Sequence, residues 1–294
     1  MNNSNQYQIL SDYRVIRISG DDSEKFLQGQ LTCDLKDANG EKVVIGGYCN
    51  VQGRLHATFY LAKINSGYLL VCPTVVAEHL TATLAKYAVF FQTSINLEES
   101  LALIAYTNNH QQEDLMQMNL TKDIASKVKV TFALGELAVA ILETNHLNDL
   151  LQTKLAAYET TSTDIFALQQ IRKQIPMVQV STIETLLPHY IGLPQVGGVN
   201  FEKGCYTGQE VVARMHYRGS LKTHPSIAEI ESQANLEAGT PIVNHLDKKV
   251  GELINSAVQK GSKNKLVALI SLADKALQDE LSVAGHPLQL LSAD

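Results

Sequence analysis

The sequence predicts an α+β fold, with a body of short strands and amphipathic helices that is followed by a smaller, strand-rich C-terminal domain. The 294 residues are 45% hydrophobic and 18% charged, a composition typical of a folded chain with about two or three domains. Apolar residues recur at helical spacing in several stretches of the first part, and glycine-separated β-rich runs begin at about residue 223. We therefore expect a body at residues 1–220 and a second domain at residues 221–294.

The body begins with a strand and a helix that local signals mark clearly. Residues 13–18 alternate as a strand, and Gly20 ends it. Asp21 and Glu24 have the spacing of a capping box, which predicts a helix N-terminus at this point. The same periodicities predict the remaining elements of the body, namely strands at 43–48, 55–62, 68–72, 101–106 and 136–142 and helices at 77–91, 146–158 and 164–173.

The C-terminal domain reads as strands throughout. Its β-rich runs are short and are punctuated by glycines, which is typical of a small β-barrel or sandwich. The runs lie at 226–231, 240–244, 249–258, 265–272 and 282–291.

Composition and charge exclude several classes of protein. The apolar runs are much shorter than the ~18 residues that a membrane span needs, and the N-terminus lacks the basic and apolar stretches of a signal peptide. We therefore expect a cytoplasmic protein without a membrane partner. The net charge of −6 argues against general nucleic-acid binding. Scattered cysteines (Cys33, Cys49, Cys72 and Cys205) predict neither a disulfide framework nor a metal site.

The stretch at residues 203–214 carries the strongest chemical signal. Thr207 and Glu210 form a second capping-box pattern, which places Cys205 just before a helix N-terminus. The partial positive charge at such a position favours a thiolate and attracts anions. Basic residues also outnumber acidic ones here, with Lys203, Arg214, Arg218 and Lys222 against Glu202 and Glu210. Two other interpretations remain. In the first, the basic residues solvate a helix face and the Cys205 thiol is packed and unreactive. In the second, Cys205 and His216 form a catalytic pair.

The same stretch resembles the signature of a known family. Lys-Gly-Cys-Tyr-Thr-Gly-Gln-Glu at 203–210, continued by Val-Val-Ala-Arg, is similar to the motif of the YgfZ family. These are folate-binding proteins, linked to tRNA modification, that are related to the glycine-cleavage T-protein, an aminomethyltransferase. Further similar blocks follow in the same order over nearly the whole chain, at 18–32, 49–54, 86–90 and 188–201.

The resemblance implies a T-protein-like ring of three domains, with a two-lobed folate-binding body whose lobes interleave in the sequence and a C-terminal β-barrel. It implies tetrahydrofolate or another reduced folate as the ligand. Tyr13 and Phe166 fall where enteric members carry tryptophans against the folate, although core packing is their plainer role. The motif adds further candidate folate-binding residues, which are Lys203, Tyr206, Gln209, Glu210 and Arg214.

The resemblance also bears on activity. True aminomethyltransferases carry an acidic pair after the glycine turn, whereas this chain has Ala57 and Thr58 there. General acid–base help worth ~10²–10⁴-fold is therefore missing. We expect a folate-binding accessory protein that acts through Cys205 to support iron–sulfur enzymes, including those that thiolate tRNA. The thiol would relay a one-carbon unit or protect a cluster.

Two other functions stay open. The first is a folate-dependent one-carbon transferase with a different acid–base constellation. The second is direct RNA binding through Lys203, Arg214, Arg218 and Lys222. The acidic pI of about 5.8 makes this second alternative the weaker one, so we expect an indirect link to tRNA and no strong direct nucleic-acid binding.

Overall fold

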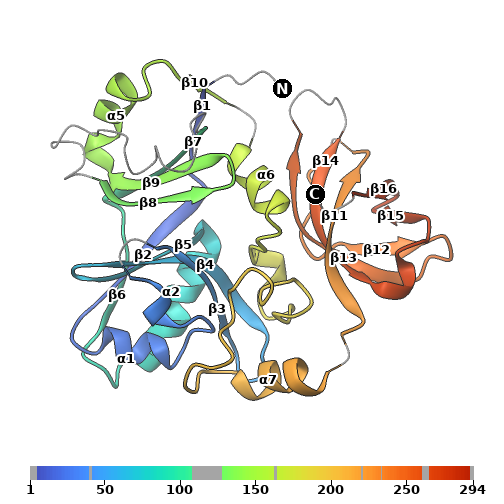
Figure 1. Ribbon diagram of the computed structural model, residues 1–294, viewed down its shortest axis with the longest axis horizontal. Coiled ribbons are helices and arrows are strands. Elements are labelled where there is room, and N and C mark those ends of the chain that lie inside the picture. Colours follow the sequence, from blue (N-terminus) through green and yellow to red (C-terminus); the bar gives the residue numbers. More distant parts are fainter. Residues whose placement is uncertain are drawn as a thin grey trace.

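Three β units surround the central helix α6 (Ile165–Arg172) and the segment that follows it (Figure 1). The computed structural model describes residues 5–39, 42–107, 128–161, 164–219, 221–232, 234–259 and 265–291. Two of the units are five-stranded sheets and the third is a closed barrel. This mixed architecture confirms the predicted α+β fold class.

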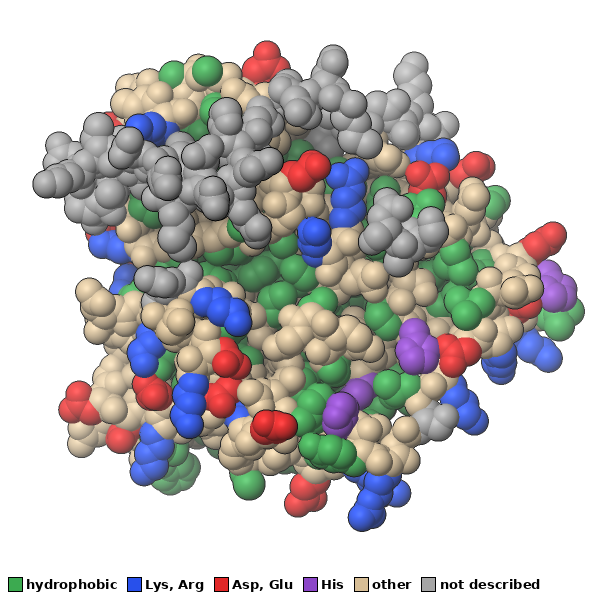
Figure 2. Space-filling view, in the orientation of Figure 1, with side chains coloured by type: hydrophobic (Ala, Val, Ile, Leu, Met, Phe, Trp, Pro, Cys, Tyr) green, Lys and Arg blue, Asp and Glu red, His purple; other side chains and the backbone are tan. Residues whose placement is uncertain are grey.

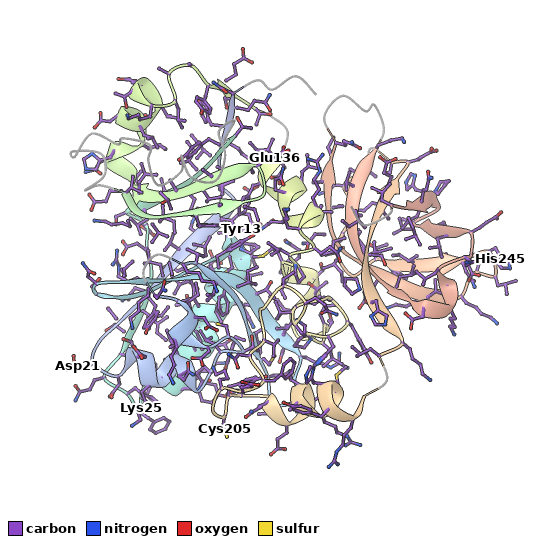
Figure 3. The ribbon with its side chains drawn as sticks, viewed as in Figure 1. Tyr13, Asp21, Lys25, Glu136, Cys205 and His245 are labelled. Atoms are coloured by element: carbon purple, nitrogen blue, oxygen red, sulfur yellow. The ribbon has the colours of Figure 1, made fainter. Side chains whose placement is uncertain are left out.

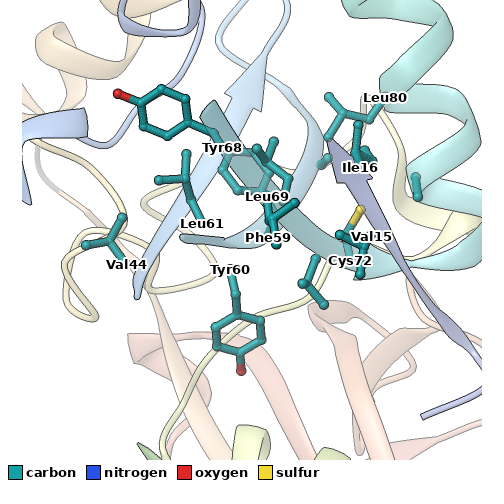
Figure 4. Packing of buried hydrophobic residues seen from close by; sticks show 14 of the residues in the cluster. Val15, Ile16, Val44, Phe59, Tyr60, Leu61, Tyr68, Leu69, Cys72 and Leu80 are labelled. Atoms are coloured by element: carbon teal, nitrogen blue, oxygen red, sulfur yellow. The ribbon is translucent and has the colours of Figure 1, made fainter. Parts of the chain in front are cut away.

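The first sheet has the strand order β3-β4-β5-β2-β6, and all its neighbours are antiparallel. Its strands are β2 (Tyr13–Ser19), β3 (Val44–Cys49), β4 (Leu55–Ile64), β5 (Gly67–Pro73) and β6 (Ser94–Leu97). Helices α1 (Ser23–Gln28) and α2 (Thr74–Ala88) belong to this unit. Figure 4 shows how Ile16, Phe59 and Leu69 pack together with no exposed surface. Burying such side chains stabilises the fold by about 1.5–3 kcal/mol each.

The second sheet has the order β10-β1-β7-β9-β8. Its strands are β1 (Gln6–Ile9), β7 (Leu101–Thr107), β8 (Val128–Leu134), β9 (Leu137–Glu143) and β10 (Glu159–Thr160), and helix α5 (Leu147–Thr153) accompanies them. β1 comes directly before β2 in the sequence, yet it pairs with β7 and β10. The two sheets therefore interleave along the chain.

The barrel closes in the order β11-β14-β13-β12-β15-β16. Its strands are β11 (Thr223–Ile230), β12 (Pro241–Asn244), β13 (Lys249–Val258), β14 (Leu266–Ala273), β15 (Leu281–Val283) and β16 (His286–Leu290). The run expected at 282–291 is a hairpin, because Ala284 and Gly285 both turn with positive φ. Closure settles the choice between barrel and sandwich in favour of the barrel.

A side chain of the barrel fixes the segment after α6. The carboxamide of Asn255 accepts a hydrogen bond from the Met177 N–H at 2.9 Å and donates to the Met177 carbonyl at 2.9 Å. Both polar groups of Met177 are thereby satisfied by the barrel. No helix of the described ranges is long and apolar enough to cross a membrane.

Both predicted capping boxes are wrong. α1 is preceded by Asp22, whose carboxylate accepts from the Gln92 N–H instead of capping the helix, while Glu24 binds Lys63 and Tyr68. The helix of the Cys205 motif, α7 (Gln209–Arg218), begins after Gly208 and has no side-chain cap. The helix expected at 146–158 is also shorter, because the 3₁₀ helix Thr144–His146 comes before it and residues 154–157 form a turn.

Candidate functional site

The loop that carries Cys205 is anchored to residues 29–33 of the first unit. The Asn200 N–H donates to the Thr32 carbonyl at 2.9 Å, and the Thr32 hydroxyl donates to the Gly198 carbonyl at 2.5 Å. Further along, the Thr207 N–H donates to the Gly29 carbonyl at 3.2 Å. The loop is therefore held at both ends by backbone groups of a single segment.

Lys203 clamps the middle of this loop. Its ammonium donates to the carbonyl oxygens of Leu31 and Cys33, each at 2.7 Å, and lies 5.3 Å from the centre of the Tyr206 ring. The side chain is buried, and burial lowers the pKa of Lys203 to about 8. The sequence treated Lys203 as part of a basic surface, whereas the structure uses its charge to hold the backbone.

Two glycines set the end of the loop. Gly208 has a φ of +83°, and a Cβ there would clash with the Asn50 carbonyl oxygen and approach the Cys49 Cβ at 3.0 Å. Gly53 is also closely packed, since a Cβ added at this position would lie 2.9 Å from the Val211 Cβ. The turn at residues 49–54 and the start of α7 therefore fit together only because both positions lack a side chain.

Cys205 is the exposed member of the four cysteines. Burial raises the pKa of Cys33 and of Cys49 to about 12 and raises that of Cys72 as well, so these three remain thiols. In Figure 3, Cys205 lies at the edge of the molecule beside α7. His216 stacks on Phe201, with ring centres 3.7 Å apart, and the described residues show no hydrogen bond between it and Cys205.

A cavity of about 710 Å³ lies where the first sheet, α6 and the barrel meet. Tyr13 and Thr74 line it from the first unit, and Gln170 lines it from α6. Carboxylates of Asp12, Asp164 and Glu237 also border it. Its volume lies within the range of small-molecule sites. Figure 3 shows Tyr13 near the centre of the molecule, away from Cys205.

Tyr13 is fixed by its neighbours in this cavity. Its hydroxyl donates to the Gln170 carboxamide oxygen at 3.0 Å, and Gln170 in turn donates to the Tyr60 hydroxyl at 3.2 Å. Burial, followed by the nearby Tyr60, raises the pKa of Tyr13. Phe166 has no exposed surface and meets Tyr13 edge to face at 5.1 Å. Phe166 thus supports the Tyr13 ring from behind and does not line the cavity.

The lining fits a reduced folate chemically. The Thr74 hydroxyl is buried at the cavity and has no hydrogen-bond partner in the described part of the chain, so a ligand can satisfy it. A pterin presents adjacent N–H donors on its pyrimidinone edge, and a carboxylate such as that of Asp12 or Glu237 accepts such donors in pairs. Arg14, also at the cavity, is the matching group for a carboxylate tail.

The structure keeps the motif apart from this cavity. None of the candidate folate-binding residues of the motif lines the central cavity. These residues are Lys203, Tyr206, Gln209, Glu210 and Arg214. Tyr206 is buried beneath the loop, and burial raises its pKa. Glu210 and Arg214 instead border a groove of about 480 Å³ along α7. The folate role of these five residues stays a prediction.

Sequence reasoning missed a cluster of histidines in the first unit. His56 Nδ1 and His79 Nε2 are 2.9 Å apart, and His56 Nε2 lies 3.7 Å from a Glu184 carboxylate oxygen. Burial lowers the pKa of His56, against the opposing charge of Glu184. The three residues come from β4, α2 and a loop, so no spacing in the sequence reveals them. The described residues contain no group of three or more side chains that could hold a metal ion.

Comparison with solved structures defines the class of protein. The fold matches the glycine cleavage system aminomethyltransferase T from Bartonella henselae with a TM-score of 0.76, over 98% of this chain and 85% of that one. The two sequences are 15% identical, so this likeness shows the fold alone. The protein therefore has the T-protein fold.

Sequence comparison then gives the family. No protein-family model matches the chain. The chain is 30% identical to the tRNA-modifying protein YgfZ of Colwellia psychrerythraea over 221 residues, which is 72% of this chain and 68% of that protein. It is 30% identical to the protein of the same name from Aliivibrio fischeri over 248 residues, or 83% and 76%. The chain belongs to the YgfZ family.

Proposed function

We propose that this protein binds a reduced folate in the central cavity and supports tRNA modification as an accessory protein that acts through Cys205. The observation that carries the folate site is the buried, unpartnered hydroxyl of Thr74 at a cavity of about 710 Å³. In this proposal Tyr13 offers its ring to the pterin, and a bordering carboxylate accepts the pterin's donors. The T-protein fold supports the same ligand class.

The thiol has a separate place in the proposal. Cys205 is exposed on a loop that Lys203 holds rigidly, which suits a group presented to another protein. The clients are iron–sulfur enzymes of tRNA thiolation. The link to tRNA modification is supported by the names of the relatives.

A one-carbon transferase is the second candidate, and the carboxylates at the cavity favour it. Asp12, Asp164 and Glu237 could supply acid–base groups other than the acidic pair of the aminomethyltransferases. At that pair's place, Ala57 and Thr58 are fully buried, and the Thr58 hydroxyl accepts from the Val178 N–H at 2.8 Å. This arrangement supports the accessory role over the transferase.

Anaerobic calorimetry of the reduced protein with tetrahydrofolate tests the folate site. We expect a micromolar dissociation constant, about −8 kcal/mol. Thr74→Val keeps the side-chain shape but removes the hydroxyl, so it should weaken binding roughly fivefold, about 1 kcal/mol. Thr144→Val, at an exposed position, is the matched control. Absence of binding, or equal binding by both variants, would contradict the site.

The role of the thiol has its own test. A strain that lacks its own YgfZ-family protein should regain tRNA thiolation with the wild-type chain and not with Cys205→Ser. Cys33→Ser, at a buried thiol, serves as the comparison variant. A Cys205→Ser chain that restores thiolation fully would remove the thiol from the proposal. Detection of a new folate adduct after incubation with aminomethyl donors would favour the transferase.

A further inference from the structure

The outward face of α7 has no partner among the residues that the structure describes. α7 lies at the edge of the molecule, and of its ten residues only Val212 is buried. Figure 2 shows charged and hydrophobic side chains side by side at this edge, over α7. A groove of about 480 Å³ runs along the helix here. The face therefore combines charge, apolar surface and a hollow.

Helical geometry arranges the side chains of this face in order. Successive residues are about 100° apart around a helix, so Arg214 and Arg218 lie next to each other, one turn apart. Tyr217 flanks this pair on one side. Val211 and Met215 flank it on the other side, where they line the groove with both arginines. Around the helix, the two arginines thus lie between an aromatic residue and two apolar residues.

The two arginines are uncommitted within the protein. Neither has a hydrogen bond or an ion pair among the described residues, whereas Arg17 is held by Glu98 and Arg54 by the Thr185 carbonyl. One carboxylate, that of Glu210, borders the same groove. The Cβ atoms of residues four apart on a helix are about 5–6 Å from each other. Two free guanidiniums at this spacing suit adjacent phosphates of one strand.

Tyr217 adds a stacking surface beside these cations. Its side chain is 67% exposed. Its ring meets His216 edge to face at 4.8 Å, and His216 itself lies flat on Phe201, with ring centres 3.7 Å apart. The rings of Phe201 and His216 support the Tyr217 ring on one side and leave it open to solvent. Exposed aromatic rings next to arginines are the pattern that binds unpaired bases, whereas an acidic protein partner would require only the cations.

We propose that this face of α7, formed by Arg214, Tyr217 and Arg218, binds a single-stranded segment of RNA. The two guanidiniums hold phosphates, and Tyr217 stacks on an unpaired base. The inference rests on the proposed role in tRNA modification and makes the contact with RNA direct. The net charge of −6 repels a polyanion elsewhere, so the binding is local and salt-sensitive.

Fluorescence anisotropy with a labelled, unmodified anticodon stem-loop RNA tests the proposal on the full chain. Between 50 and 200 mM salt, two phosphate contacts give a slope of log K against log salt of about −1.4. Arg218→Glu should lower the affinity at least tenfold and bring this slope to about −0.7, the value for the one phosphate contact that remains. Tyr217→Ala should weaken binding of the stem-loop about tenfold and leave binding of a blunt duplex unchanged.

Lys248→Glu is the matched control, because Lys248 is exposed on the barrel and the substitution changes charge equally. Equal RNA affinity of Arg218→Glu and Lys248→Glu would overturn the proposal. So would loss of tRNA thiolation in cells by Arg218→Glu with unchanged RNA affinity, because the face would then dock a protein.

The folate titration keeps the two proposals separable. Arg218→Glu should bind tetrahydrofolate as the wild type does, since Arg218 lies on α7 and not at the central cavity. Lost RNA binding with intact folate binding in this variant supports the α7 site. Absence of folate binding by the wild type contradicts the folate proposal alone and leaves the RNA measurement to decide the α7 site.

Discussion

The central cavity takes its lining from three parts of the fold, whereas the Cys205 loop is tied to one short segment, residues 29–33. The cavity keeps a polar atom unpaired, the Thr74 hydroxyl. The loop is instead held by the buried ammonium of Lys203 and exposes the Cys205 thiol to solvent. The cavity therefore has the enclosure that a small molecule needs, whereas the loop presents the Cys205 thiol to solvent.

The largest effect is expected from Lys203→Met, which tests whether the loop depends on its buried cation. The substitution keeps a chain of similar length but leaves the Leu31 and Cys33 carbonyls without donors. Two unpaired buried carbonyls cost about 4 kcal/mol together. Urea unfolding should show this loss, and Lys36→Met, at an exposed lysine, should show none. A loss below about 1 kcal/mol would mean that the loop does not depend on the clamp.

A slightly smaller loss of stability is expected when acid protonates His189. This side chain lies buried near Phe201 and His216 under α7. Burial, then the nearby His216, lowers the pKa of His189 to about 4. The unfolded chain, with a pKa near 6.5, binds the proton more tightly, so stability is complete above about pH 6.5. As the pH falls from 6.5 to 4, about 3 kcal/mol should be lost.

His189→Leu should flatten this pH dependence of the urea midpoint while keeping stability at pH 7. His245→Gln, at an exposed histidine, should follow the wild type. If His189→Leu and the wild type lose stability in parallel between pH 6.5 and 4, another group carries the acid sensitivity of this region.

The smallest effect is expected from Gly208→Ala, and it asks whether loop and cavity are independent. A φ of +83° costs an alanine about 1–2 kcal/mol, and the Asn50 carbonyl must also move. Thermal unfolding should show this loss, while the affinity for tetrahydrofolate stays unchanged. Gly204→Ala, where a Cβ meets no atom within 4 Å, is the matched control. A changed folate affinity in Gly208→Ala alone would show that the two regions are coupled.

Local patterns predicted most of the first sheet and the barrel correctly. Alternating apolar residues and turn glycines act over a few positions, so β2, β5 and β13 lie close to where the sequence places them. The strands β1 and β10 have four and two residues, and their hydrogen-bond partners are distant in the sequence. Such short strands carry too little periodicity to be recognised.

The candidate site was harder to predict because its geometry depends on distant contacts. The sequence singled out Cys205, and the structure exposes it. The burial of Lys203 depends on carbonyls 170 and 172 positions away, which no local signal encodes. The capping boxes failed for the same reason, since Lys63 and Tyr68 bind the Glu24 carboxylate and the close approach of Asn50 requires a glycine at position 208. Thr74 and Asp12 carry no motif, so the cavity had to be seen in three dimensions.

The interleaving of the two sheets sets an order of events during synthesis. Residues 13–97 contain every strand of the first sheet, so this sheet can assemble while later segments are still being made. β1 emerges before it but must wait with unpaired backbone groups until β7 and then β10 have been translated. Long-range closures of this kind are slow. A tag or truncation at the N-terminus would therefore disturb the second sheet, which is completed after the first, and spare the first sheet, whose strands begin at β2.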